Sequence, residues 1–400
     1  MAALARITTA GALRIPERLG SMYMVKRDKT SSANITNYNR GTGGRSSFSG
    51  LVVTVFGAKG TLGRFIVNRF GRIGSQVVVP YRGCPSDVRD LKLMGDLGQI
   101  LFNPFELRDE ESVRQVCQYS NIVINCIGKE FETRNYTYDQ VHVEGARTIA
   151  KVAKQCGVER LIHVSALNAG NPGSKWHKSK LAGEEAVLYE FPEATIFRPA
   201  DFVDVNDKFC NYYMSNARTI TKFRPFYGQS ILKNYLHFHN GGHQIKMPVL
   251  IRNVATGIVN AIKDPSTCGQ IYQCVGPHAY TLRDLVTFIW TCGEYKGYIK
   301  NEYGQLYMKA YIREKMYEMF GVPVPKLTLD RLARETISDQ LDPSLPTLED
   351  LGVTPENVED KIFYIMRLYG DRNGPFGDPL PMRMPVTPQI RFKTNEIVME

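Results

Sequence analysis

The sequence predicts an α/β fold: a Rossmann-type, doubly wound parallel sheet with a smaller C-terminal α/β domain and an extended tail. Three observations support this class. Short runs rich in β-branched residues alternate with amphipathic helical patterns over about 150 residues, which indicates βαβ units. Most of these runs are almost continuously apolar, as expected for strands buried on both faces of a parallel sheet. The first run ends in a glycine turn that opens a helical pattern.

The first βα unit contains this glycine motif. The run Val52–Phe56 ends in Gly57-Ala-Lys-Gly60-Thr-Leu-Gly63, and apolar residues from Leu62 to Phe70 then fall on one helical face. In a dinucleotide site, the first glycine allows the tight turn, the second lets the pyrophosphate approach the backbone, and the third lets the helix pack closely. The helix N-terminus offers N–H groups and a partial positive charge to phosphates. The alternative is a glycine-rich turn that binds no ligand.

The second strand bears on the choice of cofactor. The run Gln76-Val-Val-Val-Pro-Tyr81-Arg82 places an arginine where a doubly wound sheet faces the adenosine ribose. An acid at this place suits the free 2′-hydroxyl of NAD, whereas an arginine suits the 2′-phosphate of NADP. The nearest acid, Asp87, comes only after a turn. We therefore expect NADP(H) rather than NAD(H); the alternative for Arg82 is a solvated loop charge.

The later elements are predicted from the same periodicities and from capping residues. The further strands are expected at 98–102, 121–128, 160–165, 194–199 and 270–275, and the run at 248–253 is expected to return the chain to the sheet domain. The further helices are expected at 110–117 after a cap at Asp109 or Glu110, at 138–156 before Gly157, at 175–190, at 254–263, at 281–290 from the pair Thr281 and Asp284, and within 295–320.

The first residues predict a mitochondrial import peptide. The segment MAALARITTAGALRIPERLG has spaced arginines, many small residues and no acid before Glu17. Residues 1–45 hold eight Lys or Arg against two acids, so six of the ten net positive charges lie there. The remaining chain is nearly balanced in charge and gives little support for nucleic-acid binding. The alternative is a disordered basic tail. No run of about 18 apolar residues predicts a membrane-spanning helix.

The chain divides into five predicted parts, bounded by shifts in composition. They are the import peptide 1–35, a lead-in 36–50 rich in glycine and serine, the NADP(H)-binding domain 51–205 plus 246–276, the smaller domain 206–245 plus 277–340, and an extended tail 341–400 that packs on something else. The eight cysteines include no C-x-x-C pair, and we expect them to be reduced, as in the mitochondrial matrix.

Together these motifs resemble the extended short-chain dehydrogenase/reductase family. The resemblance is carried by the glycine turn, Tyr81-Arg82, Val123-Ile-Asn-Cys-Ile-Gly128, Val158–Ser165, Ser179-Lys180, Arg198-Pro199 and Val254-Ala255. The lead-in NYNRGTGGRSSFSG, the signature PYRG at 80–83 and the proline-rich tail are more closely similar to the short-chain-dehydrogenase-like accessory subunits of mitochondrial respiratory complex I. This resemblance implies a bound NADPH and a role in assembling or stabilising that complex, without turnover.

The resemblance also implies a set of cofactor-binding residues. They are Gly57, Lys59, Gly60, Thr61, Leu62, Gly63, Tyr81, Arg82, Leu107, Ile127, Gly128, Ser165, Lys180 and Pro199. It implies no catalytic residue and no metal ligand in this chain. The implied partners are other complex I subunits, with a peripheral contact on the matrix side of the mitochondrial inner membrane and no nucleic acid.

The acid/base position departs from the pattern of active family members, which use Tyr-x-x-x-Lys. Lys180 fits the lysine position, but Trp176 stands at the tyrosine position. An indole N–H does not titrate near neutral pH and cannot act as a general acid. Ser165 ends its strand, and Ala166 and Leu167 occupy the next two places where the family's serine could fall. We therefore expect the chain to hold the cofactor without using it.

Several alternatives stay open at this point. His177 could supply a proton, although a surface histidine is favoured. His237, His239 and His243 could bind zinc, although the glycines between them indicate a turn between strands. The alternative function is a soluble matrix NADPH-dependent reductase or sugar-nucleotide-modifying enzyme. A nucleotide-regulated RNA or membrane-surface binder is a third, which the weak net charge after residue 45 disfavours.

Overall fold

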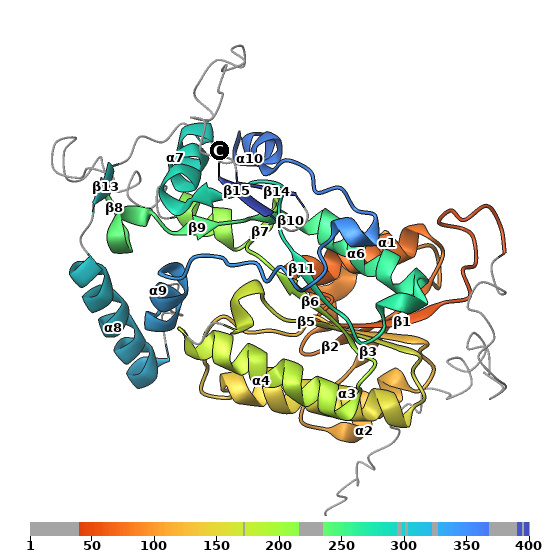
Figure 1. Ribbon diagram of the computed structural model, residues 1–400. Coiled ribbons are helices and arrows are strands. Elements are labelled where there is room, and N and C mark those ends of the chain that lie inside the picture. The colour runs from red at the N-terminus through yellow and green to blue at the C-terminus, as the bar shows by residue number, and fades with distance from the viewer. Residues whose placement is uncertain are drawn as a thin grey trace, which may run out of the picture. The chain divides into compact units, whose positions relative to one another are not determined.

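The structure is a computed structural model, which describes residues 40–170, 173–215, 235–293, 298–300, 303–321, 327–367, 390–393 and 396–399. Its centre is a seven-stranded parallel sheet in the order β11-β6-β5-β4-β1-β2-β3 (Figure 1). The strands are β1 (Val52–Phe56), β2 (Gln76–Tyr81), β3 (Ile100–Pro104), β4 (Ile122–Asn125), β5 (Arg160–Val164), β6 (Thr195–Pro199) and β11 (Ile271–Cys274). The predicted doubly wound α/β class is confirmed. The predicted import peptide lies outside the described residues.

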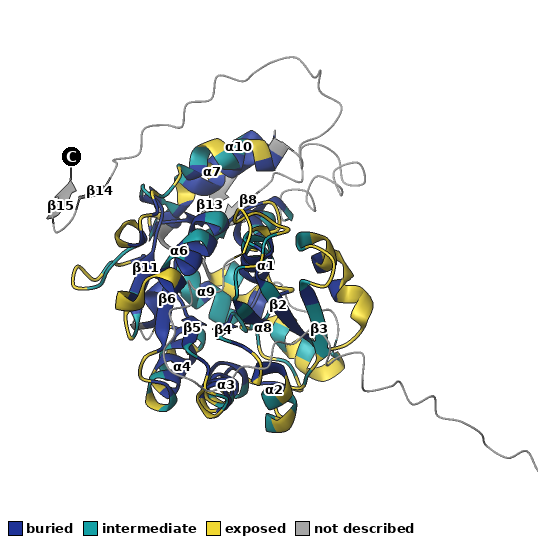
Figure 2. Cartoon of the chain, turned by 90° about the vertical axis from the view of Figure 1, so that its right-hand side faces the viewer, coloured by how far each residue is buried: buried dark blue, intermediate teal, exposed yellow. Residues whose placement is uncertain are grey.

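Helices cover both faces of this sheet. Figure 1 shows α1 (Thr61–Arg72) and α6 (Ile251–Lys263) over one face, and α2 (Glu110–Cys117), α3 (Gly145–Gln155) and α4 (Lys175–Glu190) over the other. Alternate residues of one strand belong to different cores: Ile122 and Ile124 pack with α1 and α6, whereas Val123 packs with α2 and α3. This period of two is what a strand buried on both faces requires. The inner strands are accordingly buried in Figure 2, whereas β3 at the edge of the sheet is only partly buried, and exposed residues lie on the outer sides of the helices.

The predicted helix caps are present. The Asp109 side chain accepts a hydrogen bond from the backbone N–H of Glu111 at the start of α2. Thr281 accepts one from the N–H of Asp284 at the start of α7 (Leu282–Cys292). Gly157 follows α3 with a φ of 69°, a conformation that favours glycine. A π-helical turn, η4 (Gln140–Glu144), precedes α3, so the predicted helix 138–156 is made of two pieces.

The C-terminal half adds a second hydrophobic core. Side chains from β7 (Phe202–Val203), α7 and α10 (Val358–Arg367) share one buried cluster. Short strands pair outside the main sheet: β10 (Val249–Leu250) with β7, β12 (Tyr280–Thr281) with β9 (Ile245–Lys246), β13 (Tyr298–Lys300) with β8 (Tyr235–His237), and β14 (Ile390–Lys393) with β15 (Glu396–Met399). The helices α8 (Tyr303–Phe320) and α9 (Leu329–Glu335) complete this half. The proposed domain boundaries stay a prediction.

The first part of the predicted extended tail is ordered against the fold instead. The Gln273 side chain at the sheet edge donates to the Asp342 carbonyl at 2.7 Å, and the Gln273 backbone N–H donates to Pro346 O at 2.9 Å. Leu348 and Leu351 join the core beneath α6. This segment therefore covers the edge of β11, which a sheet otherwise leaves unpaired. The helix α10 then packs on α7, so the extended description was wrong for 341–367.

Three further boundaries differ from the predictions. β3 begins two residues later than expected, because the predicted start, Gly98, has a φ of 79° and lies in the preceding turn. β4 ends at Asn125, so residues 126–128 form a loop at the end of the strand. α6 begins at Ile251, three residues before the predicted start at Val254, and the two residues ahead of it form β10, which pairs with β7. The side chains of His237 and His239 lie outside the described residues, and no metal-binding cluster occurs among those that are described.

Candidate nucleotide-binding site

The glycine turn after β1 is held in a geometry that side chains would break. Gly57 has a φ of 78°, and a Cβ there would lie 2.9 Å from the backbone of Cys126. A Cβ on Gly63 would overlap Gly57 O and lie 2.7 Å from Ala58 Cα. Gly60 is the N-cap of α1 and has no capping side chain. The first N–H groups of the helix therefore remain available to a ligand at the N-terminus of α1.

A cavity of about 290 Å³ opens in front of this turn at the carboxyl ends of the strands. Eight of the predicted cofactor-binding residues line it: Gly60, Thr61, Leu62, Gly63, Gly128, Ser165, Lys180 and Pro199. Six do not: Gly57, Lys59, Tyr81, Arg82, Leu107 and Ile127. Of these, Lys59 pairs with Asp87 at 2.8 Å, Leu107 packs against Gly145, and Arg82 lies beside Tyr136. The structure thus brings most of the turn together with Gly128, Ser165, Lys180 and Pro199, and it places the six other residues outside the cavity lining.

Ser165 and Lys180 present polar groups at the cavity wall. The Lys180 side chain is only 5% exposed, and its Nζ donates to Val164 O at 3.2 Å. Burial lowers the pKa of Lys180 to about 8, and it raises the pKa of the adjacent Cys126 thiol to about 12. The buried Ser165 hydroxyl has no hydrogen-bond partner among the described residues. A buried hydroxyl without a partner costs free energy, so these residues fit a polar ligand in the cavity.

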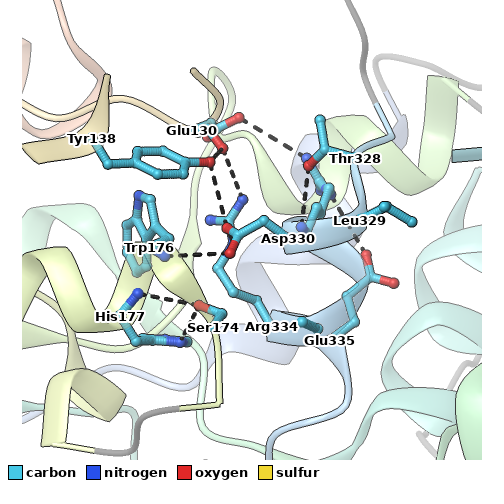
Figure 3. Close-up of polar contacts among 12 residues, drawn as sticks. Glu130, Tyr138, Ser174, Trp176, His177, Thr328, Leu329, Asp330, Arg334 and Glu335 are labelled. Carbon is cyan, nitrogen blue, oxygen red and sulfur yellow. Dashed lines mark hydrogen bonds and ion pairs between the residues drawn. The ribbon is translucent and has the colours of Figure 1, made fainter. Parts of the chain in front are cut away.

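Trp176 is clamped from two sides, and Figure 3 shows one of them, the contact with Asp330. Its indole Nε1–H donates to Lys129 O at 2.6 Å, and its backbone N–H donates to Asp330 Oδ1 at 3.3 Å. The Arg334 guanidinium lies 4.7 Å from the centre of its ring, and the same guanidinium donates to Glu130 O at 3.2 Å. The helix α9, which carries Asp330 and Arg334, thus packs over the start of α4 and over the loop after β4. This contact covers Trp176, the residue that the sequence analysis predicts at the acid/base position.

The histidines near Trp176 are buried and neutral. His142 Nε2 accepts the backbone N–H of Lys129 at 3.0 Å, so its Nδ1 carries the proton toward Ser179 Oγ at 2.8 Å. Burial and the nearby Lys180 lower the pKa of His142 to about 2. His177 is also buried, so the expectation of a surface histidine was wrong. Its Nδ1 lies 3.0 Å from Ser174 Oγ, and burial and Arg334 lower its pKa to about 3.

The sequence analysis missed a set of charged residues at the far end of the cavity. These are Asp201, Lys246, Arg331, Arg334, Glu335 and Asp339. Buried Lys246 donates to Ile337 O at 2.9 Å and lies 3.6 Å from Asp339. The spacing of Asp330 with Arg334, and of Arg331 with Glu335, would have indicated an ion-paired helix. No local signal shows that this helix packs on Trp176.

This chain is similar to known proteins both in fold and in sequence. A sequence model of the NAD dependent epimerase/dehydratase family matches residues 53–190. The structure is similar to a triphenylmethane reductase of Citrobacter (TM-score 0.58, 14% identity, covering 79% of this chain and 99% of that one). It is also similar to the NADPH-dependent quinone oxidoreductase QOR2 of Escherichia coli in complex with NADPH (TM-score 0.57, 14% identity, 78% and 99%). At these identities the likeness shows the fold alone.

Relatives of higher identity cover most of the chain. The mitochondrial NADH dehydrogenase (ubiquinone) 1 alpha subcomplex subunit 9 of Mus musculus is 41% identical over 330 residues, which are 82% of each chain. The Arabidopsis thaliana subunit of the same name is 35% identical over 353 residues (86% of this chain, 85% of that one). A mitochondrial NADH-ubiquinone oxidoreductase 40 kDa subunit of Neurospora crassa is 30% identical over 362 residues (90% and 88%).

The fold and the glycine cradle define a Rossmann-type α/β protein whose residues 53–190 match the NAD dependent epimerase/dehydratase family. Within that class, the chain belongs to the family of the mitochondrial NADH dehydrogenase (ubiquinone) 1 alpha subcomplex subunit 9. Among the described residues, no helix combines the length and the hydropathy needed to cross a membrane.

Proposed function

We propose that this chain is a non-catalytic accessory subunit of mitochondrial NADH:ubiquinone oxidoreductase (complex I) that binds NADPH as a structural ligand. The family relatives carry the names of subunits of that enzyme. The single observation that carries the non-catalytic part is the clamped Trp176 beside an otherwise complete nucleotide cradle. The role of the bound nucleotide is then to stabilise the domain that contacts the other subunits.

The residues present fit NADPH. The glycine turn and the N-terminus of α1 would hold the pyrophosphate, and Lys180 and Ser165 would bind the nicotinamide half. Arg82 follows β2, where the ribose of the adenosine half would lie. The nearest acid, Asp87, is paired with Lys59 at 2.8 Å rather than offered to a ribose 2′-hydroxyl. These observations support NADPH over NADH. When bound, the cofactor offers hydride chemistry, which needs a proton donor beside it.

Neither Trp176 nor His177, the two residues considered for the acid/base role, is a suitable proton donor. The indole does not titrate near neutral pH, and its N–H is already bonded to Lys129 O. His177, the predicted alternative donor, is held neutral at pH 7 by burial, and its Nδ1 is engaged by Ser174. Arg334 covers the outer face of the indole. The site can therefore bind and orient a nucleotide, while neither Trp176 nor His177 offers a proton to a carbonyl substrate.

The proposed location is the matrix side of the inner membrane, as a peripheral subunit. Helix α8 supports a surface contact, because it exposes seven large apolar side chains. They are Tyr307, Met308, Tyr311, Ile312, Met316, Met319 and Phe320. Lys309, Arg313 and Lys315 lie among them together with Glu314 and Glu318, so the helix offers a largely apolar contact surface with a small net positive charge. Met319→Glu should weaken sedimentation with anionic phosphatidylglycerol vesicles, whereas Leu97→Glu, at a loop leucine that is 93% exposed, should not.

Size fractionation of a mitochondrial extract tests the assembly part of the proposal. We expect the chain to migrate with complex I and not as a free protein. A free pool that oxidises NADPH, and that loses this activity in Lys180→Ala, would instead support the alternative of a soluble matrix reductase or sugar-nucleotide-modifying enzyme. Native mass spectrometry of the same fractions would show whether NADPH stays with the chain.

A further inference from the structure

Three cations converge on one aromatic ring, that of Tyr136. Arg108 Cζ lies 4.2 Å from the centre of the Tyr136 ring, and Arg82 Cζ and Lys129 Nζ lie 5.2 Å from it. The three side chains come from the loops after β3, β2 and β4, so the chain brings them together only at the carboxyl edge of the folded sheet. Like charges repel one another, so placing three cations around one ring costs electrostatic free energy. A bound anion would offset that cost.

Neutral groups hold these cations and the ring in place. Lys129 Nζ donates to Thr133 Oγ1 at 2.5 Å, and Arg108 Nη2 donates to Asn135 O at 2.5 Å and Gln140 Oε1 at 3.0 Å. Tyr136 is 7% exposed, and its hydroxyl donates to the Glu106 carboxylate. Because carbonyl, amide and hydroxyl oxygens position the cations without neutralising them, their charge stays available to a ligand.

The cluster carries a net positive charge, which suits a phosphate monoester. The three cations and the nearby carboxylates of Glu106 and Glu132 leave a formal charge of 3 − 2 = +1, and a phosphate monoester carries about −1.5 to −2 at pH 7. Burial and the nearby Arg82 charge lower the pKa of Lys129, which shows that the two cations act on each other. An anion between them would relieve that repulsion.

Lys129 connects the cluster with the nucleotide cavity. It lines the cavity, its carbonyl accepts the Trp176 indole N–H, and its ammonium reaches the Tyr136 ring. A ligand that extends from the glycine turn toward the end of β2 can therefore place a phosphate in the cluster. A free anion in solution would have no such anchor.

We propose that Arg82, Arg108 and Lys129 form, around Tyr136, one subsite that binds the 2′-phosphate of NADPH. Arg108 and Lys129 are then specificity-determining residues in addition to Arg82. This inference rests on the proposed binding of NADPH. Inorganic phosphate or an anionic lipid headgroup would offer the same chemistry, and the experiment below separates these sources.

The test measures the binding of four probes to the full chain by calorimetry: NADPH, NADH, inorganic phosphate and phosphatidylglycerol vesicles. We expect Arg108→Met and Lys129→Met each to weaken NADPH binding roughly tenfold to a hundredfold, and to change NADH binding less than about threefold. The matched control is Arg114→Met on α2, whose guanidinium pairs with Glu110 and Glu111 and should leave all affinities unchanged. The ratio of NADPH to NADH affinity does not depend on the fraction of folded protein.

The outcomes distinguish a failure of the proposed NADPH binding from a failure of the proposed phosphate subsite. A parent chain that does not bind NADPH overturns the proposed function. A parent that binds NADPH, with variants that lose neither cofactor or lose both equally, overturns the subsite alone. Phosphate or vesicle binding that depends on Arg108, without any preference for NADPH over NADH, assigns the cluster to another anion and also overturns it. Arg108→Lys should restore part of the preference, since a single charge remains.

Discussion

Gly63→Ala tests whether the cradle is built for a nucleotide. The added Cβ would overlap Gly57 O and lie 2.7 Å from Ala58 Cα and 3.0 Å from Ala58 C, where ordinary contacts are about 3.4–4 Å. All three neighbours are backbone atoms, so no side-chain rotation relieves the clash. The start of α1 must therefore move away from the turn by about 1 Å, a strain of about 1–3 kcal/mol.

This displacement should affect the ligand more than the fold. The N–H groups of α1 would leave the pyrophosphate position, and we expect NADPH affinity to fall roughly tenfold to a hundredfold. Calorimetric titration measures the affinity, and urea unfolding measures the stability. The control is Gly304→Ala at the start of α8, where a Cβ meets no atom within 4 Å. It should leave affinity unchanged and stabilise the helix by about 0.5–1 kcal/mol. Unchanged NADPH binding in Gly63→Ala would refute the role of the turn.

The clamp on Trp176 and the buried histidines give three more expectations. Asp330→Ala removes the acceptor of the Trp176 backbone N–H and the partner of Arg334, so urea unfolding should show a loss of about 1–3 kcal/mol. Trp176→Tyr should gain no steady-state oxidation of NADPH with quinones or ketones, measured by absorbance, because Arg334 still covers the position. The folded pKa values of His142 and His163, about 2 and about 3, lie below the unfolded value of about 6.5. Protons therefore bind the unfolded chain preferentially below pH 6.5, and stability measured in urea should fall by about 1 kcal/mol per histidine per pH unit.

Each of these has an outcome that contradicts it. An Asp330→Ala chain as stable as the parent would show that the clamp contributes little free energy. NADPH oxidation by Trp176→Tyr would show that the substrate position is open. Stability that stays constant from about pH 7.5 to 5.5 would show that the histidines are solvated or already charged in the folded chain.

The sheet could be predicted because its signals are local. Each strand of the main sheet is a short apolar run, and the caps at Asp109, Gly157 and Thr281 are read from adjacent residues. A short apolar run does not define where its strand begins and ends, however. The run at 98–102 contains Gly98, which forms part of a turn. The apolar pair Val249–Leu250 forms β10, which pairs with β7 outside the main sheet. Periodicity cannot choose a partner for a two-residue strand.

The candidate site was predictable only where its parts adjoin a strand end. The glycine turn, Ser165 and Lys180 meet at the cavity as the βαβ pattern implies. The contact between Asp330 and Trp176 spans 154 residues, and nothing in either segment indicates the other. The burial of His177 has the same cause, because it depends on packing that no local pattern records. The cluster around Tyr136 likewise arises from three separate loops.

The most direct test of the central claim is the fate of the nucleotide in the isolated full chain. The chain is purified with its bound nucleotide, mixed with quinone and ketone acceptors, and followed by the absorbance of the reduced nicotinamide. We predict about one NADPH per chain, which stays bound and reduced because Trp176 offers no proton. Repeated turnover of added NADPH by this chain alone would contradict the account.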